Sequence, residues 1–326
     1  MTTTPRRTAT LPRRALGTAV AAVAVLGGLH LWLNTNVFGE SALCGGLVTA
    51  EAAESVLTGA GRISDRPGPR SGADDGRTQF DCVIERGAAV LPGSGTQTLH
   101  LQGTSERGDF AFTGGRFPDA SAVSFFKGGG VGPGRAWVLL PAACTDRQAG
   151  LVEAYAPEDA DPAKVVGLLT GTANRVSDRT DCALPTPQPA PDRVAPVMPP
   201  QRAVSTGVCG LPGFTVPEVR VQSVQVSGIS WVCGTATAEG EEADYATFSV
   251  TQDPAVIEGI RKSEGFTGQG FDATHIVSDC SGKATYFAME PGPRYAESSG
   301  TGAPAPKDLF TAFTKKAGAE FDCPTG

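Results

Sequence analysis

The chain has 326 residues, a formal net charge of −7, eight cysteines, 42 glycines and 25 prolines. Residues 1–33 contain four arginines and no acid, which leaves 23 basic against 34 acidic residues beyond them, a net charge of −11. This acidity excludes nucleic acid and anionic lipid as expected partners of that part. The length allows a membrane anchor and two domains of about 140 and 120 residues.

The N-terminal segment predicts a membrane anchor. Residues 15–33 carry no formal charge, follow four arginines and precede Glu40, the first acid of the chain. An apolar run of this length spans a bilayer as a helix. The arginines on one flank place residues 1–14, a basic tail, in the cytoplasm. We therefore expect a single-pass protein of the cell membrane whose C-terminal domains are extracellular.

A cleaved signal peptide is the alternative, because a basic segment followed by an apolar run serves either purpose. No small-x-small cleavage site ends the run, and Leu43 before Cys44 does not fit a lipoprotein. Trp32 and His30 suit the outer membrane interface rather than a functional site. Both outcomes place residues 40–326 outside the cytoplasm.

Eight cysteines are shared equally by the two parts of this exported chain, which predicts structural disulfides. Zinc sites favour close cysteine pairs or nearby histidines, whereas the shortest spacing here has 23 intervening residues. No C-x-x-C motif is present, so a thiol oxidoreductase is not expected. The cysteines are Cys44, Cys82, Cys144, Cys182, Cys209, Cys233, Cys280 and Cys323.

The first four-cysteine domain is expected over residues 40–182. A short helix follows Thr49, and QFDCVIER and TLHLQ read as strands. Apolar runs on both sides of Cys144 predict a hairpin. Asp161 and Pro162 then form the N-cap and first residue of a closing helix.

The second four-cysteine domain, residues 206–326, repeats this order. Strand-like runs surround Cys233 and cover residues 245–252, a hairpin turns at Cys280, and a helix over residues 306–318 closes the domain. Asp253-Pro254 begins an additional helix where the first domain has a looser, phenylalanine-containing segment. The shared order predicts a divergent duplication.

The fold class is therefore α+β, with an N-terminal transmembrane helix and two tandem, disulfide-stapled domains, each a small antiparallel sheet with one or two helices. Four cysteines allow three pairings in each domain. A hairpin strand and a returning helix bring the third and fourth cysteines to the same end of a domain. This favours Cys144–Cys182 and Cys280–Cys323, and it leaves Cys44–Cys82 and Cys209–Cys233.

A proline-rich linker, residues 183–205, joins the two domains and carries seven prolines. Proline fixes φ and removes a backbone donor, so the segment is expected to run as an extended, semi-rigid spacer. If the domains instead pack together, the linker becomes a strap and the cleft between the domains is the expected ligand site.

Catalytic patterns are sparse. His100 and His275 are the two histidines that follow the anchor, both lie in predicted strands, and they do not coincide when the domains are aligned. The G-x-S-x-G pattern of a nucleophile elbow is missing. We therefore predict no catalytic residue at either histidine.

Glycine and acidic clusters are interpreted as loops. Residues 128–134, GGGVGPG, lack the Gly-Lys-Ser/Thr of a phosphate loop. The acids also lack calcium-loop spacing and lie in glycine-rich segments, although a carboxylate pair would be suited to glycoside hydrolysis. They are Asp74, Asp75, Glu239, Glu241, Glu242 and Asp244.

Aromatic residues lie on or just after the second hairpin strand of each domain, opposite the closing helix. Tyr155, Tyr286 and Phe287 would form a groove for an extended peptide or a glycan if they lay at the interdomain cleft. Packing in the core, which also explains Tyr295, is the alternative. No cofactor or metal site is predicted.

The motifs CGGL, FDC, WVCG and DCSGK give the chain a resemblance to a family. It resembles uncharacterised actinobacterial membrane-anchored or secreted proteins built from an Arg-flanked anchor and four-cysteine α/β domains. The resemblance implies an envelope location and provides no catalytic residues.

Together these patterns predict a non-enzymatic binding or interaction module at the cell surface, anchored through residues 15–33, whose partner is an unknown envelope protein or glycan. The alternatives are a cell-envelope hydrolase that uses a carboxylate pair and the ligand-sensing subunit of a membrane complex.

Overall fold

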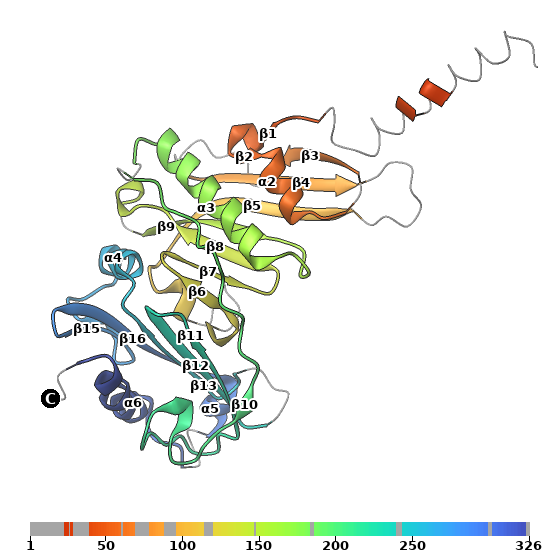
Figure 1. Ribbon diagram of the computed structural model, residues 1–326. Helices are drawn as coiled ribbons and strands as arrows, with labels where there is room; N and C mark the ends of the chain where they lie inside the picture. Colours follow the sequence, from red (N-terminus) through yellow and green to blue (C-terminus); the bar gives the residue numbers. More distant parts are fainter. Residues whose placement is uncertain are drawn as a thin grey trace, which may run out of the picture.

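The computed structural model describes residues 23–25, 27–28, 39–59, 61–68, 78–87, 96–113, 120–146, 148–182, 186–238, 243–298 and 302–323. Figure 1 shows two β-sheets, one above the other, with helices on the outer face of each. We call residues 39–182 the first half, residues 186–200 the strap and residues 201–323 the second half. The α+β class with antiparallel sheets is confirmed.

The first half contains one seven-stranded antiparallel sheet in the order β3-β4-β5-β9-β8-β7-β6, and α2 and α3 lie on one of its faces. Its elements are β1 (Ala42–Leu43), η1 (Cys44–Gly46), β2 (Val48–Thr49), α2 (Ala50–Val56), β3 (Arg62–Pro67), β4 (Phe80–Gly87), β5 (Gln97–Glu106), η2 (Phe110–Phe112), η3 (Ala120–Ala122), β6 (Ser124–Phe126), β7 (Gly129–Gly132), β8 (Arg135–Leu139), η4 (Ala142–Cys144), β9 (Ala149–Tyr155) and α3 (Pro162–Arg179).

The second half has its own seven-stranded antiparallel sheet, in the order β10-β11-β12-β13-β16-β15-β14, with α6 on its outer face. Its elements are β10 (Gln201–Arg202), η5 (Val208–Gly210), β11 (Val221–Val226), β12 (Ser230–Ala236), β13 (Ala246–Thr251), α4 (Pro254–Lys262), β14 (Gly270–Asp272), β15 (His275–Cys280), β16 (Lys283–Pro291), α5 (Pro293–Ser298) and α6 (Pro306–Glu320).

Helix starts follow the local sequence closely. The predicted N-cap Asp161 accepts a hydrogen bond from the N–H of Ala163, and Pro162 is the first residue of α3. Asp253 caps α4 in the same way, through the N–H of Ala255. Both predicted helix starts are confirmed. They could be predicted from the sequence because a side-chain cap and a proline at the first position act within one helical turn.

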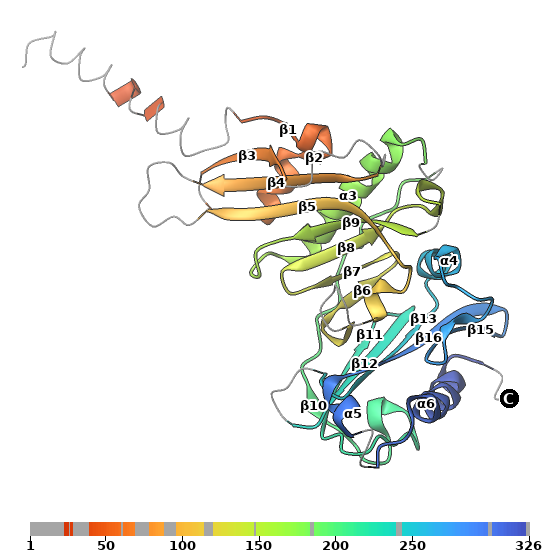
Figure 2. The same ribbon diagram turned by 180° about the vertical axis from the view of Figure 1, so that it is seen from behind.

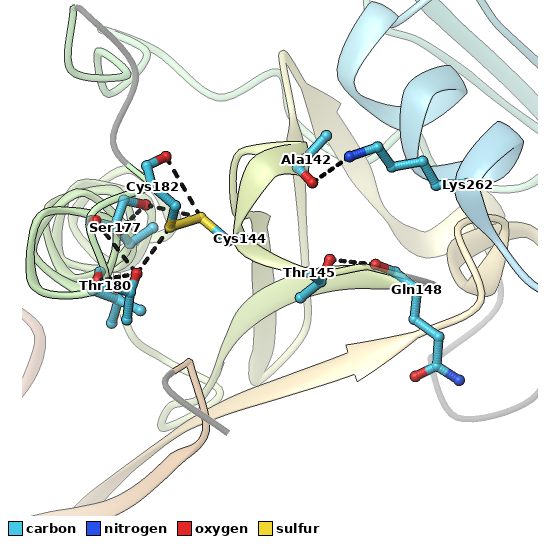
Figure 3. Close-up of a disulfide and its surroundings, with 10 residues drawn as sticks. Ala142, Cys144, Thr145, Gln148, Ser177, Thr180, Cys182 and Lys262 are labelled. Carbon is cyan, nitrogen blue, oxygen red and sulfur yellow. Dashed lines mark hydrogen bonds between the residues drawn. A yellow bond between two sulfur atoms is a disulfide. The ribbon is translucent and has the colours of Figure 1, made fainter. Parts of the chain in front are cut away.

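The four disulfides are Cys44–Cys82, Cys144–Cys182, Cys209–Cys233 and Cys280–Cys323, so every cysteine is bridged and each bridge stays within one half. These are the four pairs that the sequence favours. Figure 3 shows Cys144, just after the β8 strand, bonded to Cys182 at the end of α3. Each bridge closes a loop and stabilises the fold by about 2–4 kcal/mol.

The two sheets share a strand order. Five neighbouring strands of each sheet follow the same spatial order, β3-β4-β5-β9-β8 in the first half and β11-β12-β13-β16-β15 in the second. Cys82 and Cys233 lie on the second strand of each series, β4 and β12. Both halves also place their first cysteine in the left-handed region, with φ 55° at Cys44 and 65° at Cys209. Asp181 and Asp322 precede the last cysteine of each half with φ 54° and 55°.

The halves pack together through a common hydrophobic core. The η2 segment contacts β16 of the second half, while α4 contacts β9 of the first, so the element after the third strand of each half reaches the opposite sheet. The shared core contains Phe110, Phe112, Phe125, Trp137, Leu139 and Leu151 from the first half and Val232, Val256, Ile257, Ile260, Tyr286 and Ala288 from the second. The linker is therefore a strap, not a spacer between separated domains.

The sequence predicts a loop over the glycine-rich residues 128–134, and the structure corrects this prediction in part. Gly129–Gly132 forms β7, which pairs with both β6 and β8. A Cβ atom on Gly130 would lie 2.9 Å from the indole nitrogen of Trp137, and one on Gly129 would lie 2.3 Å from the Phe126 ring. Glycine is required because large aromatic side chains occupy the space over this strand.

The predicted membrane helix over residues 15–33 lies mostly outside the described residues, which there include only 23–25 and 27–28. No helix in the described part of the chain is long and apolar enough to cross a membrane. The structure therefore gives the predicted span no support.

Candidate functional site

A polar cluster occupies the face of the first sheet opposite α3. It is built from Asp81 on β4, His100 and Gln102 on β5, Glu153 and Tyr155 on β9 and Arg135 on β8. Strand alternation places these side chains together, because the residues between them, such as Leu99 and Leu101, point into the core under the helices. Figure 2 shows the first sheet from this side, with α3 behind it.

The histidine of this cluster is held by an acid. His100 Nε2 lies 2.6 Å from Asp81 Oδ1, and the Asp81 side chain is almost fully buried. The His100 ring stacks on Tyr155 at 5.5 Å between centroids, and the Tyr155 hydroxyl accepts a hydrogen bond of 2.7 Å from Arg135. The His100–Asp81 pair has the geometry of an oriented base, whereas no hydrogen bond of His100 within the described chain reaches a nucleophilic hydroxyl or thiol.

The centre of the cluster is a buried acid. Glu153 is fully buried, accepts a hydrogen bond from the Gln102 side-chain amide, and lies 3.6 Å from Arg135 Nη2. Burying a carboxylate is unfavourable unless charged and hydrogen-bonding partners compensate it, and Arg135 and Gln102 provide them. A structural role explains this acid without a ligand.

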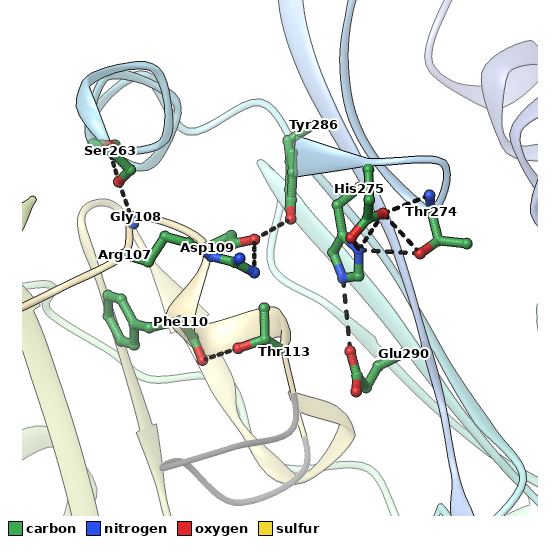
Figure 4. Close-up of polar contacts among 12 residues, drawn as sticks. Arg107, Gly108, Asp109, Phe110, Thr113, Ser263, Thr274, His275, Tyr286 and Glu290 are labelled. Atoms are coloured by element: carbon green, nitrogen blue, oxygen red, sulfur yellow. Dashed lines mark hydrogen bonds and ion pairs between the residues drawn. The ribbon is translucent and has the colours of Figure 1, made fainter. Parts of the chain in front are cut away.

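A second polar group joins the two halves (Figure 4). Asp109, fully buried in front of η2, receives two hydrogen bonds from Arg107, at 2.6 and 2.9 Å, and a third of 3.0 Å from the Tyr286 hydroxyl. Ser263 at the end of α4 accepts a hydrogen bond from Gly108 N–H at 2.6 Å. Burial and the neighbouring Asp109 raise the pKa of Tyr286 well above its usual value, so its hydroxyl remains a donor.

His275 borders the same interface. Its Nδ1 lies 2.9 Å from Asp272 and its Nε2 3.7 Å from Glu290 (Figure 4). Burial alone would lower the pKa of His275, but the nearby Glu290 carboxylate, the hydrogen bond to Asp272 and the added charge of Asp109 outweigh it and raise the pKa above the ordinary value. The folded protein therefore favours the protonated imidazolium more than the unfolded chain does.

The raised pKa of His275 predicts a pH-dependent stability. Its stabilisation is fully present below the unfolded pKa of about 6.5 and is lost as pH rises through the higher folded value. We expect the free energy of unfolding to fall over this window, and His275→Gln to flatten that fall. Urea titrations of both proteins across the pH range measure the difference, and an equally steep fall in the variant would contradict the prediction.

A pocket of about 410 Å³ lies between the strap and the first half. Three segments form its walls: the β7–β8 turn at residues 132–135, residues 156–163, which lead into the first turn of α3, and strap residues 194–197. Its floor includes Val131 and Val165, which are buried members of the first core. This volume is within the range of small-molecule sites, and the lining is dominated by valine, alanine and proline.

The strap is fixed at both ends by side-chain amides. Asn174 on α3 donates to the carbonyl of Gln188 at 2.9 Å and accepts from its N–H at 3.0 Å. Gln225 on β11 makes the same reciprocal pair with Met198, at 3.1 and 3.0 Å. Each side-chain amide thus bonds both the N–H and the carbonyl of one strap residue, as a neighbouring β-strand would. The proline-rich strap cannot form a regular series of backbone hydrogen bonds, because proline has no N–H. The wall of the pocket is thereby held in place.

The aromatic residues predicted to share a groove lie apart. Tyr286 and Phe287 are adjacent on β16 and therefore point to opposite faces, Tyr286 into the shared core and Phe287 into the core under α6. Tyr155 belongs to the polar cluster of the first sheet. Core packing, the alternative interpretation, accounts for Tyr286, Phe287 and Tyr295.

The acidic residues suggested as a carboxylate pair give no site in the described chain. Asp74, Asp75, Glu239, Glu241 and Glu242 lie outside the described residues. Asp244 is described, and it accepts hydrogen bonds from Thr237 and lies 3.6 Å from Arg294. It therefore holds the β12–β13 connection.

One grouping has ligand atoms close enough for a metal among the described residues: Cys44, Asp65 and Cys82. The two sulfurs form a disulfide, and the Asp65 carboxylate accepts a hydrogen bond from Cys44 N–H. A disulfide sulfur is not a thiolate ligand, so this grouping has a structural role.

Comparisons with protein-family models, with curated proteins and with solved structures find no match for this chain. The candidate site therefore rests on the geometry alone.

The sequence analysis missed both the pocket and the polar cluster. The alternation of His100 and Gln102 with apolar neighbours indicates that these two side chains share one face of a strand. Glu153 and Arg135 lie on strands that are distant in sequence, so the alternation does not place them beside this face. The pocket has no local signal, because its walls come from three separate segments.

Proposed function

We propose that this protein is a non-enzymatic, extracytoplasmic binding module, anchored at the cell membrane through residues 15–33, and that the pocket beneath the strap is its ligand site. The observation that carries the proposal is a pocket of about 410 Å³ whose outer wall is pinned by two amide pairs. A wall ordered before binding lowers the entropic cost of holding a ligand.

Location outside the cytoplasm is supported by the use of all eight cysteines in disulfides, which persist in oxidising compartments. An origin by duplication is supported by the common strand order and by the left-handed Cys44 and Cys209 at equivalent places. The polar cluster distinguishes the halves: the register that equates Cys82 with Cys233 places Ala288 where the first half has Glu153.

The binding proposal is tested by titrating the full-length protein with benzyl alcohol, a neutral apolar probe, by calorimetry. We expect saturable binding that is lost when either wall is filled, by Ala163→Phe or by Ala195→Phe. Ala319→Phe, an exposed substitution on α6, is the matched control and should leave binding unchanged. Binding that survives both wall variants would overturn the pocket as the site.

A hydrolase is the second candidate, and the His100–Asp81 pair favours it. Hydrolysis of cell-wall fragments, esters or peptides by the purified protein, abolished by His100→Ala, would replace the binding proposal. We expect no such turnover, because the described hydrogen bonds connect His100 only with Asp81.

A further inference from the structure

The charges at the pocket rim have the same sign. Of the charged side chains that line the pocket, Glu158 and Asp161 are exposed acids at its edge. The third is Arg135, whose guanidinium is directed to Tyr155 and Glu153 in the polar cluster and is largely shielded from solvent. A molecule entering the pocket therefore meets two carboxylates at the rim.

These carboxylates retain the capacity to bind a cation. Asp161 uses Oδ1 to cap α3 through Ala163 N–H, which leaves Oδ2 available at the surface. Within the described chain, Glu158 forms no ion pair, and its side chain lies beside the β7–β8 turn at Gly134. An opposite charge within about 4–6 Å would be attracted to either acid.

The floor and walls select the rest of the ligand. Val131 and Val165 form an apolar floor, and strap residues Pro196 and Val197 continue the apolar surface outward. Burying an apolar body here gains about 25 cal/mol for each Å² of apolar surface removed from water. The charges at the rim then determine whether a ligand with a positive, a negative or no charged group binds best.

We propose that the pocket takes ligands that combine an apolar body with a positive charge, such as an organic ammonium ion. This inference rests on the proposed binding function and names its ligand class. The apolar body occupies the space between Val165 and the strap, while the ammonium group lies between Glu158 and Asp161. Anionic ligands of the same shape are disfavoured by both acids.

Three probes with one ring and different charge test the proposal in calorimetric titrations of the full-length protein: benzylammonium, benzyl alcohol and phenylacetate. We expect benzylammonium to bind about three- to fivefold more tightly than benzyl alcohol, since exposed ion pairs are worth up to about 1 kcal/mol. Phenylacetate should bind most weakly. High salt should reduce these differences.

The double variant Glu158→Gln/Asp161→Asn should bind benzylammonium and benzyl alcohol equally. Asparagine caps a helix as well as aspartate does, so α3 keeps its N-cap while the rim loses its charge. Asp159→Asn is the matched control, because Asp159 is exposed beside Glu158 but does not line the pocket.

The outcomes separate the two proposals. Equal binding of the three probes to the unmodified protein, blocked by Ala163→Phe, would keep the pocket as a binding site and overturn its preference for cations. No binding of any probe would overturn the binding site itself. A cation preference that persists in the double variant would overturn the assignment to Glu158 and Asp161.

Discussion

Replacing Asp109 with alanine is expected to lower the free energy of unfolding of the whole protein by about 3 kcal/mol. Asp109 is fully buried where the halves meet and is the acceptor for both Arg107 and Tyr286. Arg107 is partly exposed and can turn towards water. The Tyr286 hydroxyl is buried and would be left without an acceptor, which is the larger part of the cost.

The control is Tyr286→Phe, which removes the donor and leaves Asp109 with Arg107. It should cost about 1 kcal/mol alone, and in the Asp109→Ala background it should recover part of the lost stability, because the hydroxyl that would be stranded is gone. Urea denaturation followed by circular dichroism gives the four values of this double-mutant cycle. Additive losses, or a loss below about 1 kcal/mol for Asp109→Ala, would contradict the assignment of Asp109 as the acceptor that joins the halves.

Urea denaturation followed by tryptophan fluorescence tests whether the halves unfold together. Trp137 lies in the core shared by the two halves, whereas Trp231 lies in the core under α6, so the two tryptophans report on different parts of the molecule. With Trp32→Phe in both proteins, and either Trp137→Phe or Trp231→Phe added so that one tryptophan remains in each, we expect coincident fluorescence transitions. Separate midpoints would show that the shared core does not couple the halves.

Gly108→Ala is expected to destabilise the protein by about 3 kcal/mol because it drives α4 away from the first half. A Cβ atom on Gly108 would lie 2.2 Å from the Gly259 carbonyl carbon and 2.2 Å from the Ile260 nitrogen. Both are backbone atoms of a helix and cannot turn aside as a flexible side chain would. The substitution also shifts Ser263, which accepts a hydrogen bond from Gly108 N–H.

Gly167→Ala is the matched control and should have the opposite effect. Gly167 lies inside α3, and a Cβ atom there would have no heavy atom within 4 Å. Alanine in a helix interior is favoured over glycine by about 0.5–1 kcal/mol, so stability should rise. Thermal unfolding of both variants measures the contrast. Equal effects of the two substitutions would show that the α4 crossing is not tightly packed.

Much of the fold could be predicted because its signals are local. Asp161 with Pro162 and Asp253 with Pro254 define helix starts within one turn, and the runs around Cys144 and Cys280 define hairpins within about 20 residues. The cysteine pairing followed from those elements. Each of these inferences needed only the neighbouring sequence.

The contacts between the halves could not be predicted in this way. Ile260 and Leu151 belong to the same shared core, and Asp109 accepts a hydrogen bond from Tyr286, 177 residues away in sequence. Each of these residues, taken by itself, is typical of an ordinary core or loop position. The predicted groove of Tyr286 and Phe287 was wrong for the same reason. Which core each of these side chains enters depends on what packs against each side of β16. Only the three-dimensional arrangement assigns those faces.

The absence of a disulfide between the halves has a consequence for what the strap does. The shared core already holds the two halves against each other, and Cys182 and Cys209, the cysteines that flank the strap, each pair within their own half. Cutting the chain between the amide pairs at Gln188 and Met198 would leave two separately bridged polypeptides still joined by noncovalent contacts. The molecule is thus organised as a heterodimer within a single polypeptide, and its connecting segment is available to shape a binding site.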